Sequence, residues 1–359
     1  MWIQGSMAND KYLFNELTEL SKKIKQTKGL PEDLDLKIVQ MLDRLNRIAQ
    51  IGGYAAEFDT LSRYIETVIS IPWDARTQDI LDLTNTKKVL DGSHYGMEDV
   101  KERILEYLAT ILLIKQRGGN GIVKSPVLLF VGLQGVGKTT LAISIAESLG
   151  REFVRIAMGA LGTVLELRGR SKAFPESEPG QIIKALIRSK VRNPVILLDE
   201  IEKASGEQGL RSDIMAALLE ILDPNQNPQF RDHYIDYPVD LSEVLFICSA
   251  NNTGTISTAL MDRMEVIKMP SYTDAEKIVI SRDYLMPKVM EKTSLRTEEL
   301  KIDPNLWPLV VRPFGYDTGI RSLSRTLESI SRKVAKEIVE GKSKGVLITA
   351  ENLKHYLPK

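Results

Sequence analysis

The stretch "GLQGVGKTT", residues 132–140, decides the fold of this chain. It satisfies the pattern G-x-x-x-x-G-K-[ST], with the apolar run "PVLLFV" before it and "LAISIAESLG" after it. When such a loop joins a strand to a helix, its backbone N–H groups and the helix N-terminus can cradle phosphates. The stretch therefore predicts a phosphate-binding loop between a strand and a helix.

Each residue of this loop has a predicted role. Gly132 and Gly137 let the backbone turn its N–H groups toward the phosphates. Lys138 is expected to reach the β- and γ-phosphates, and the Thr139 hydroxyl to ligate Mg²⁺. The predicted cradle is completed by Gly135, Val136 and Thr140. The loop thus predicts ATP and Mg²⁺ as cofactors.

Strands and helices alternate on both sides of the loop. Further apolar runs are "EFVRIAMG", "PVILLDE", "VLFICSAN" and "EVIKMP", with helical patterns such as "GQIIKALIRSK" and "IMAALLEIL" between them. Continuous apolar strands separated by helices are typical of a parallel sheet covered on both faces. The chain is therefore predicted to hold an α/β core.

Polar residues follow two of these strands. Asp199 and Glu200 end "PVILLDE", where Asp199 would hold Mg²⁺ through water and Glu200 would act as general base on the attacking water. Asn251 ends another strand, and its residue type favours a turn as much as a contact to the attacking water. Arg263 and Arg321 could neutralise phosphate charge, but an arginine on a helix is more often a surface group.

The remaining sequence is mostly helical. Residues 1–76 form a predicted helical arm and linker, with apolar residues at helical spacing and breaks at "KGLPED" and "IGGY". This arm has little core of its own, so we expect it to dock on a neighbour. Residues 77–270 form the predicted α/β domain, and residues 271–359 a smaller α-helical lid domain.

Composition excludes several classes of protein. The 359 residues include 48 basic and 48 acidic ones, so their zero formal charge gives no support to a main nucleic-acid or membrane partner. The one cysteine, Cys248, lies in an apolar run and is predicted to be buried and inert. With three histidines, none at metal-ligand spacing, a histidine-assisted nucleophile is disfavoured, whereas a Ser–Lys pair stays open. The start "MWIQGSMAND" has no signal-peptide pattern and no apolar run could span a bilayer, so a cytoplasmic location is expected.

The motifs together resemble a known family. "HYGMEDVKERILEYLA", "GLQGVGKTTLA", "PVILLDEIEK", "ALLEILDPNQN", "FRDHYIDYPVDLS", "SANN", "DRMEVI" and "GYDTGIRSL" are collinear with the ATPase module of the bacterial and mitochondrial type of Lon protease, an AAA+ enzyme. The resemblance runs from about Leu17 to the last residues. The chain ends at "YLPK", before the family's protease domain would begin, so no peptide-bond cleavage is expected of these residues.

The resemblance implies further roles. Asn251 falls at the family's sensor-1 position, Arg263 at its arginine finger and Arg321 at its sensor-2 position, while His94 and Tyr95 lie beside the adenine. An arginine finger acts on a neighbour, so the resemblance implies a ring of six identical subunits. In the family this ring pulls unfolded or damaged protein through a central pore.

The chain departs from the family where substrate is gripped. The family has an aromatic–aliphatic–glycine pore loop, but here Phe174 is followed by Pro175 and Glu176. This departure leaves an alternative open, namely a regulatory or scaffolding module that binds nucleotide without translocating. A nucleic-acid motor is a second alternative, disfavoured by the neutral charge, although an accessory contact with DNA stays open.

Overall fold

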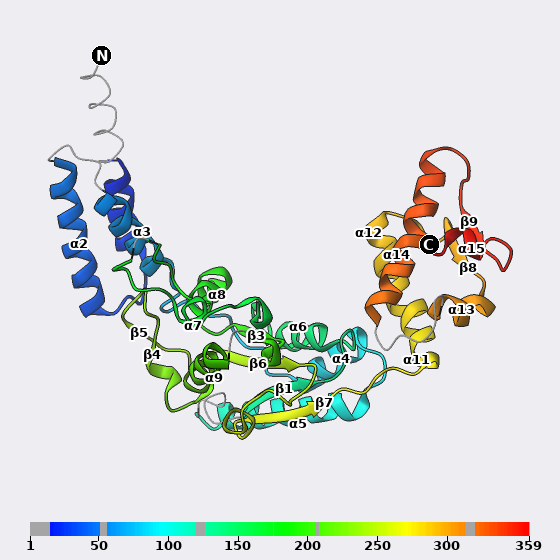
Figure 1. Ribbon diagram of the computed structural model, residues 1–359, viewed down its shortest axis with the longest axis horizontal. Helices are drawn as coiled ribbons and strands as arrows, with labels where there is room; N and C mark the ends of the chain where they lie inside the picture. Colours follow the sequence, from blue (N-terminus) through cyan, green and yellow to red (C-terminus); the bar gives the residue numbers. More distant parts are fainter. Residues whose placement is uncertain are drawn as a thin grey trace, which may run out of the picture.

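The computed structural model describes residues 15–50, 56–119, 126–174, 176–204, 208–312 and 320–358. Its centre is a sheet of five parallel strands in the order β2-β3-β6-β1-β7 (Figure 1). The strands are β1 (Val127–Val131), β2 (Phe153–Ala157), β3 (Val195–Asp199), β6 (Leu245–Ala250) and β7 (Met264–Lys268). All five arise from the apolar runs that predicted them, and the α/β class is confirmed.

Helices cover both faces of this sheet, because alternate strand residues point to opposite sides. Leu129 of β1 packs on the side of α7, α8 and α9, whereas Leu128 and Phe130 pack on the side of α4, α5 and α6. The helices are α4 (Leu83–Ser93), α5 (Glu98–Gln116), α6 (Lys138–Leu149), α7 (Val164–Arg168), α8 (Gln181–Ser189), α9 (Gln208–Leu222) and α10 (Thr258–Met261). Cys248 of β6 is fully buried, as predicted, and burial raises the pKa of its thiol.

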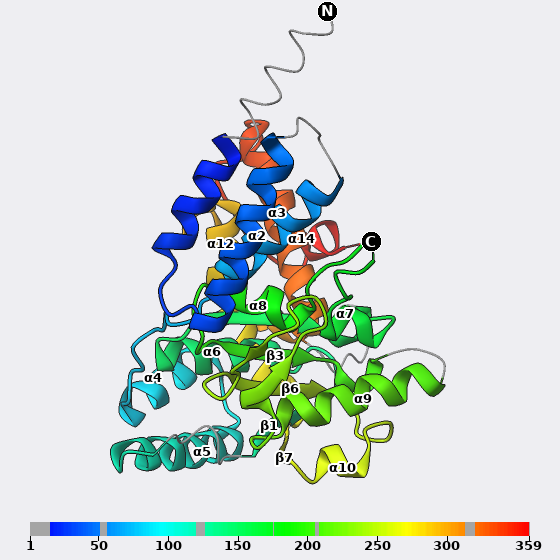
Figure 2. The same ribbon diagram turned by 90° about the vertical axis from the view of Figure 1, so that its left-hand side faces the viewer.

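The N-terminal arm consists of a helix over residues 15–26, α2 (Glu32–Gln50) and α3 (Ala56–Ser70). It docks on the core of its own chain, on the side where α7 and α8 lie (Figures 1 and 2). The Tyr64 hydroxyl donates to the Ile235 carbonyl at 2.9 Å, and the Tyr64 and Tyr234 rings are 5.7 Å apart. One continuous apolar cluster includes both the arm and this side of the sheet. The arm therefore docks on the α/β core of its own chain.

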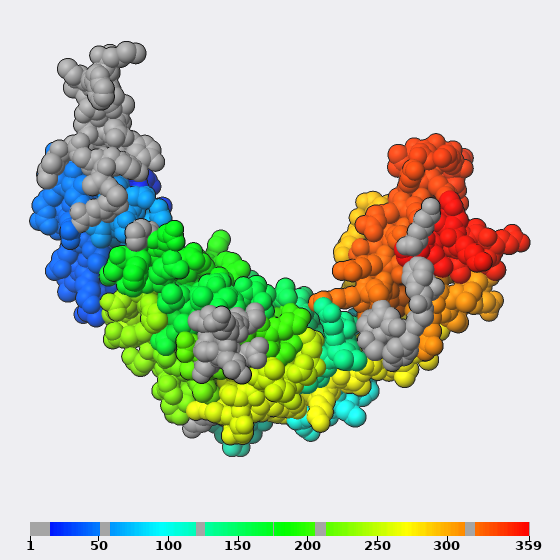
Figure 3. All heavy atoms as spheres, viewed as in Figure 1, coloured from blue at the N-terminus to red at the C-terminus, as the bar shows by residue number. Residues whose placement is uncertain are grey.

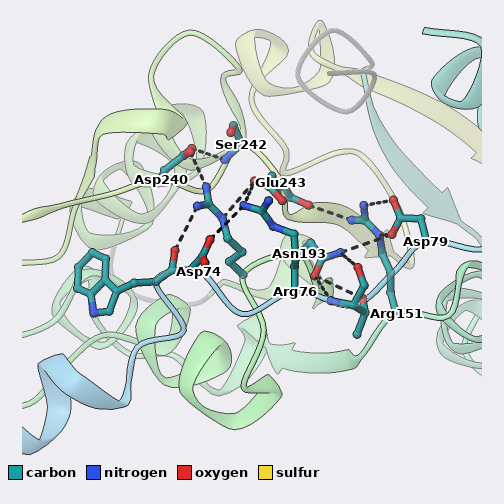
Figure 4. Close-up of polar contacts among 11 residues, drawn as sticks. Asp74, Arg76, Asp79, Arg151, Asn193, Asp240, Ser242 and Glu243 are labelled. Atoms are coloured by element: carbon teal, nitrogen blue, oxygen red, sulfur yellow. Dashed lines mark hydrogen bonds and ion pairs between the residues drawn. The ribbon is translucent and has the colours of Figure 1, made fainter. Parts of the chain in front are cut away.

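The linker after α3 is held by polar contacts, which we call the linker joint (Figure 4). Arg151 donates from Nε and Nη2 to the Asp79 carboxylate at 2.7 and 2.8 Å, and from Nη1 to the Glu243 carbonyl at 2.9 Å. The Asn193 amide exchanges two hydrogen bonds of 2.9 Å with the Thr77 backbone. The joint thus fixes the path of the chain from the arm into the α/β core.

The C-terminal lid has an apolar cluster of its own, separate from the two clusters that flank the central sheet. Its first helix begins with a capping box, in which Thr273 and Glu276 satisfy each other's backbone N–H groups. Its helices are α11 (Asp274–Val279), the π-helix η4 (Ile280–Leu285), α12 (Met286–Thr293), α13 (Trp307–Val311), α14 (Ile320–Val339) and α15 (Leu353–Tyr356). Pro287 offers no N–H to the turn before it, which favours the wider π-helix there.

Short strand pairs were not predicted. The lid holds β8 (Leu300–Ile302) beside β9 (Val346–Ile348), and the core holds the hairpin β4 (Phe230–Arg231) and β5 (Pro238–Val239). Runs of two or three residues carry too little periodicity to be recognised.

The arm and the lid stand at opposite ends of the α/β core, and the molecule is hollowed between them (Figure 3). Across the described ranges, none of the helices combines the length and the apolar character needed to cross a membrane.

Candidate functional site

The glycine-rich loop between β1 and α6 has the backbone that its sequence predicts. Gly135 and Gly137 take φ angles of +85° and +103°, which residues with a Cβ rarely adopt. A Cβ on Gly132 would lie 2.7 Å from the Met269 carbonyl oxygen, so the loop and the end of β7 can approach this closely only with glycine there. The Val136 side chain is buried in the core, which leaves only its backbone to face a phosphate.

Lys138 crosses the loop with a buried side chain. Its Nζ donates to the carbonyls of Gly132 and Leu133 at 2.6 and 3.0 Å, and to Asn251 Oδ1 at 3.0 Å. Burial lowers the pKa of Lys138, while the carboxylates nearby, Asp199 first, oppose that shift. The Lys138 ammonium can therefore bind an anion that replaces the Gly132 and Leu133 carbonyls as its hydrogen-bond acceptor.

The two acidic residues at the end of β3 are both engaged. Asp199 is buried and accepts from Arg155 Nε at 2.6 Å and from the Ser249 hydroxyl. Glu200 has a φ of +59°, a left-handed conformation that is strained for a residue with a Cβ and recurs at functional sites. Its Oε1 accepts from Lys203 Nζ at 3.0 Å. The predicted base is thus oriented by its backbone and held by a lysine.

Asn251 lies between a cation and a carboxylate. Its Oδ1 faces Lys138, and its Nδ2 donates to Glu202 Oε1 at 2.7 Å. Glu202 is only 7% exposed, and its Oε2 has no hydrogen-bond partner within the described residues. Glu202 therefore sets which end of the Asn251 amide faces Lys138.

The opposite end of the site contains His94 and Tyr95. His94 bridges Ser93 Oγ at 2.8 Å and Thr140 Oγ1 at 2.9 Å. Burial, assisted by Lys101 and Lys288, lowers the pKa of His94 to about 4, so its imidazole is neutral at pH 7.

Aromatic and apolar side chains from core and lid meet beside this histidine. The Tyr95 ring stands edge-on to the Tyr284 ring, with centroids 6.3 Å apart. Ile280 and Leu285 of η4 line the same cavity. This end of the cavity can therefore accept a flat, largely apolar group.

Core and lid enclose these residues in one cavity of about 350 Å³. Arg321 of α14 lines it, and the backbone N–H of Ile320 donates to the Gly135 carbonyl at 3.1 Å. The structure thus brings most of the predicted site residues together. Those that line the cavity are His94, Tyr95, Gly135, Gly137, Lys138, Thr139, Thr140, Asp199, Glu200, Asn251 and Arg321.

Four predicted residues do not line the cavity, namely Gly132 and Val136 of the phosphate loop, Arg263 and Phe174, and a fifth lies outside the described residues. The Arg263 side chain is 36% exposed and pairs with Asp223 at 3.1 Å. Phe174 is 59% exposed on the loop before α8. Pro175 is the predicted residue on which the structure gives no information.

The cavity has donors suited to Mg²⁺, which prefers oxygen ligands and usually shares them with phosphates. Thr139 and Asp199 line it together and supply a hydroxyl and a carboxylate. Within the described part of the chain, no group of three or more His, Cys, Asp or Glu could hold a metal ion. Mg²⁺ would therefore depend on nucleotide oxygens and water for its other ligands.

Sequence reasoning missed four polar partners: Arg155, Glu202, Lys203 and Ser249. Glu202 and Lys203 stand within "DEIEK", three and four residues after Asp199, and this spacing of charges was a signal that could have been used. Arg155 and Ser249 lie within strands, and only the pairing of β2, β3 and β6 places them beside Asp199.

Comparison with known proteins adds two family matches. Residues 128–271 match the model of the ATPase family associated with various cellular activities (AAA), and residues 291–346 match the Lon protease AAA+ ATPase lid domain. The first match includes the phosphate loop, β3 and β6. The second lies within the lid.

Curated relatives match almost the whole chain. Lon protease of Brevibacillus choshinensis is 42% identical over 96% of this chain and 43% of its own length. Lon protease of Halothermothrix orenii is 41% identical over 93% of this chain and 42% of its own length. Lon protease 1 of Bacillus subtilis is 40% identical over 99% of this chain and 45% of its own length. The chain thus spans less than half the length of these relatives. It belongs to the AAA+ ATPases and corresponds to the ATPase and lid module of the Lon proteases.

Proposed function

We propose that this chain hydrolyses ATP with Mg²⁺ in the cavity between core and lid, and uses the energy to unfold and translocate protein substrates. The observation that carries the proposal is the convergence of Lys138, Asp199, Glu200 and Asn251 on one cavity whose other wall is the lid. The family matches and the Lon relatives support ATP as the nucleotide.

The side chains of the cavity divide the work of hydrolysis. Lys138 would exchange its two carbonyl partners for β- and γ-phosphate oxygens, and Asn251 would contact the γ-phosphate or the attacking water. Thr139, and Asp199 through water, would hold Mg²⁺, which when bound neutralises phosphate charge. Glu200 would take a proton from the attacking water once it leaves Lys203.

Two arginines would complete the site. Arg321 already lines the cavity and would contact the phosphates of its own subunit. Arg263 does not line its own cavity and is partly exposed, which suits a group that completes a neighbour's site. This supports a ring of identical subunits, six if it follows the family, with turnover conditional on assembly.

Movement of the lid would convert hydrolysis into work on a substrate. The hydrogen bond from Ile320 to Gly135 joins α14 directly to the phosphate loop, so a change at the phosphates reaches the lid. Phe174 is an exposed aromatic on the loop where the family grips substrate. Unfolded or damaged proteins of the cytoplasm are the proposed substrates, and an accessory DNA contact stays open.

A second candidate is a regulatory or scaffolding module that binds nucleotide without translocating. It is favoured by Phe174 being followed by proline and glutamate where the family has an aliphatic residue and glycine. Threading of a labelled unfolded polypeptide separates the two, since only the motor moves it in an ATP-dependent way.

The proposed hydrolysis is tested by Glu200→Gln, with Glu340→Gln on the lid surface as control. Removing a general base is expected to lower turnover by roughly 10²–10⁴-fold while ATP still binds. Turnover per chain of the parent should rise steeply with chain concentration, because the site is completed by a neighbour. Unchanged turnover in Glu200→Gln would contradict the assignment of the base.

A further inference from the structure

Asp199 is paired with an arginine that the proposed hydrolysis does not use. Arg155 Nε lies 2.6 Å from Asp199 Oδ2, while the other oxygen accepts from the Ser249 hydroxyl. Arg155 stands on β2, the strand next to β3, and its register partner is Leu197, so its side chain extends along the strands to reach the carboxylate. Among the described residues, Arg155 is the cation that forms an ion pair with Asp199.

The two partners differ in burial. The Asp199 side chain is 5% exposed, and that of Arg155 is 46% exposed. A buried carboxylate is costly without a partner, whereas a half-exposed guanidinium can move into water. Arg155 does not line the cavity, although Asp199 does. The arginine therefore approaches Asp199 from outside the cavity.

The other charges around Asp199 have partners elsewhere. Lys138 donates to two loop carbonyls and Asn251, and Lys203 pairs with Glu200. Glu202 is held by Asn251, and Arg321 faces the cavity from the lid. None of these cations has a direct bond to Asp199 in the described structure. Arg155 is thus the cation in direct contact with Asp199, whereas Lys138 interacts with this carboxylate without a direct bond.

We infer that Arg155 is the counter-ion that replaces Mg²⁺ at Asp199 when the metal is absent, and so sets how strongly ATP binding depends on the metal. This rests on the proposed function, since it takes ATP and Mg²⁺ as the ligands of the cavity. Without Arg155, the unbalanced carboxylate repels metal-free ATP. With Mg²⁺ present, the same carboxylate attracts the metal more strongly because no neighbouring positive charge competes.

The test measures ATP affinity by calorimetry, once with EDTA and once with excess MgCl₂, in the parent chain and in Arg155→Gln. The ratio of the metal-free to the metal-bound dissociation constant is expected to rise by about tenfold in Arg155→Gln, as the loss of a partly screened charge near a divalent ion predicts. Arg155→Lys keeps the charge and should leave the ratio within about twofold of the parent.

Arg103→Gln is the matched control. Arg103 is also 46% exposed and also forms an ion pair, with Glu265, but it does not line the cavity or contact Asp199. Its ratio should equal that of the parent. Circular dichroism of each variant without nucleotide verifies the fold.

The outcomes separate this inference from the proposed function. If the parent chain binds no ATP under either condition, the proposed function fails. If the parent binds ATP but Arg155→Gln keeps the parent's ratio, or Arg155→Lys changes it as much as Arg155→Gln, Arg155 has only a structural role and the inference is overturned.

Discussion

The linker joint predicts a large loss of stability for a single change, Asp79→Asn. Asp79 is 10% exposed and accepts two hydrogen bonds from Arg151, which is 3% exposed, and one from Lys115. Asparagine keeps the shape but removes the charge, so the Arg151 guanidinium stays buried without a counter-ion. Breaking a buried pair in this way costs about 3–5 kcal/mol of unfolding free energy.

Asp240→Asn provides the comparison, because Asp240 lies beside the linker joint (Figure 4). Asp240 pairs with Arg192 at 2.8 Å, but the Asp240 side chain is 43% exposed, so water can solvate the groups of this pair after the substitution. Exposed pairs contribute about 0–1 kcal/mol. Urea unfolding followed by tryptophan fluorescence measures both variants against the parent, because Trp73 lies beside the joint and its carbonyl accepts from Arg192. A loss below about 1 kcal/mol for Asp79→Asn, equal to that of Asp240→Asn, would refute the reasoning.

Two further predictions concern the cavity. The pKa of His94 falls from 6.5 in the unfolded chain to about 4 in the folded one, so the unfolded chain binds more protons between pH 4 and 6.5. The free energy of unfolding should therefore decrease as pH falls from about 6.5 to 4, by up to roughly 3 kcal/mol. His94→Gln should remove that part of the pH dependence in urea titrations at several pH values, and an unchanged slope would show that His94 is not its source. Glu202→Ala releases the Asn251 amide and is expected to lower ATP turnover about tenfold with little change in ATP affinity, whereas Glu202→Gln keeps an acceptor for Nδ2 and should retain turnover. Equal losses of turnover in both variants would contradict this positioning role.

The central fold could be predicted because its information is local. The strands β1, β3 and β6 each contain a run of four or more apolar residues, β2 and β7 are mostly apolar, and the phosphate loop carries its glycine and lysine spacing in nine residues. The strand order could not be obtained in this way, because it depends on pairing between distant segments. For the same reason the sequence indicated that the arm needed a partner, but not that Tyr64 would meet Ile235, 171 residues away.

The candidate site was predictable where chemistry follows the end of a strand. Asp199, Glu200 and Asn251 follow apolar runs, and parallel strands bring such ends to one edge of the sheet. Arg155 escaped prediction because a charged residue in the middle of an alternating strand is typical of a solvated face. Glu202 escaped because a glutamate at a helix start is usually exposed, whereas here it is buried behind Asn251.

The apolar clusters join the arm to the core more firmly than the lid. The arm shares one cluster with the sheet, so turning it against the core would expose buried apolar surface. The lid keeps its cluster to itself and meets the core through isolated contacts, such as the hydrogen bonds from Ile320 to Gly135 and from Tyr284 to the Asp91 carbonyl, and the edge-on pair of Tyr95 and Tyr284. We therefore expect the arm to keep its position on the core and the lid to move. A pair of distance probes on α6 and α14 should show a distance that changes with the bound nucleotide, whereas the distance between probes on α2 and β3 should stay constant.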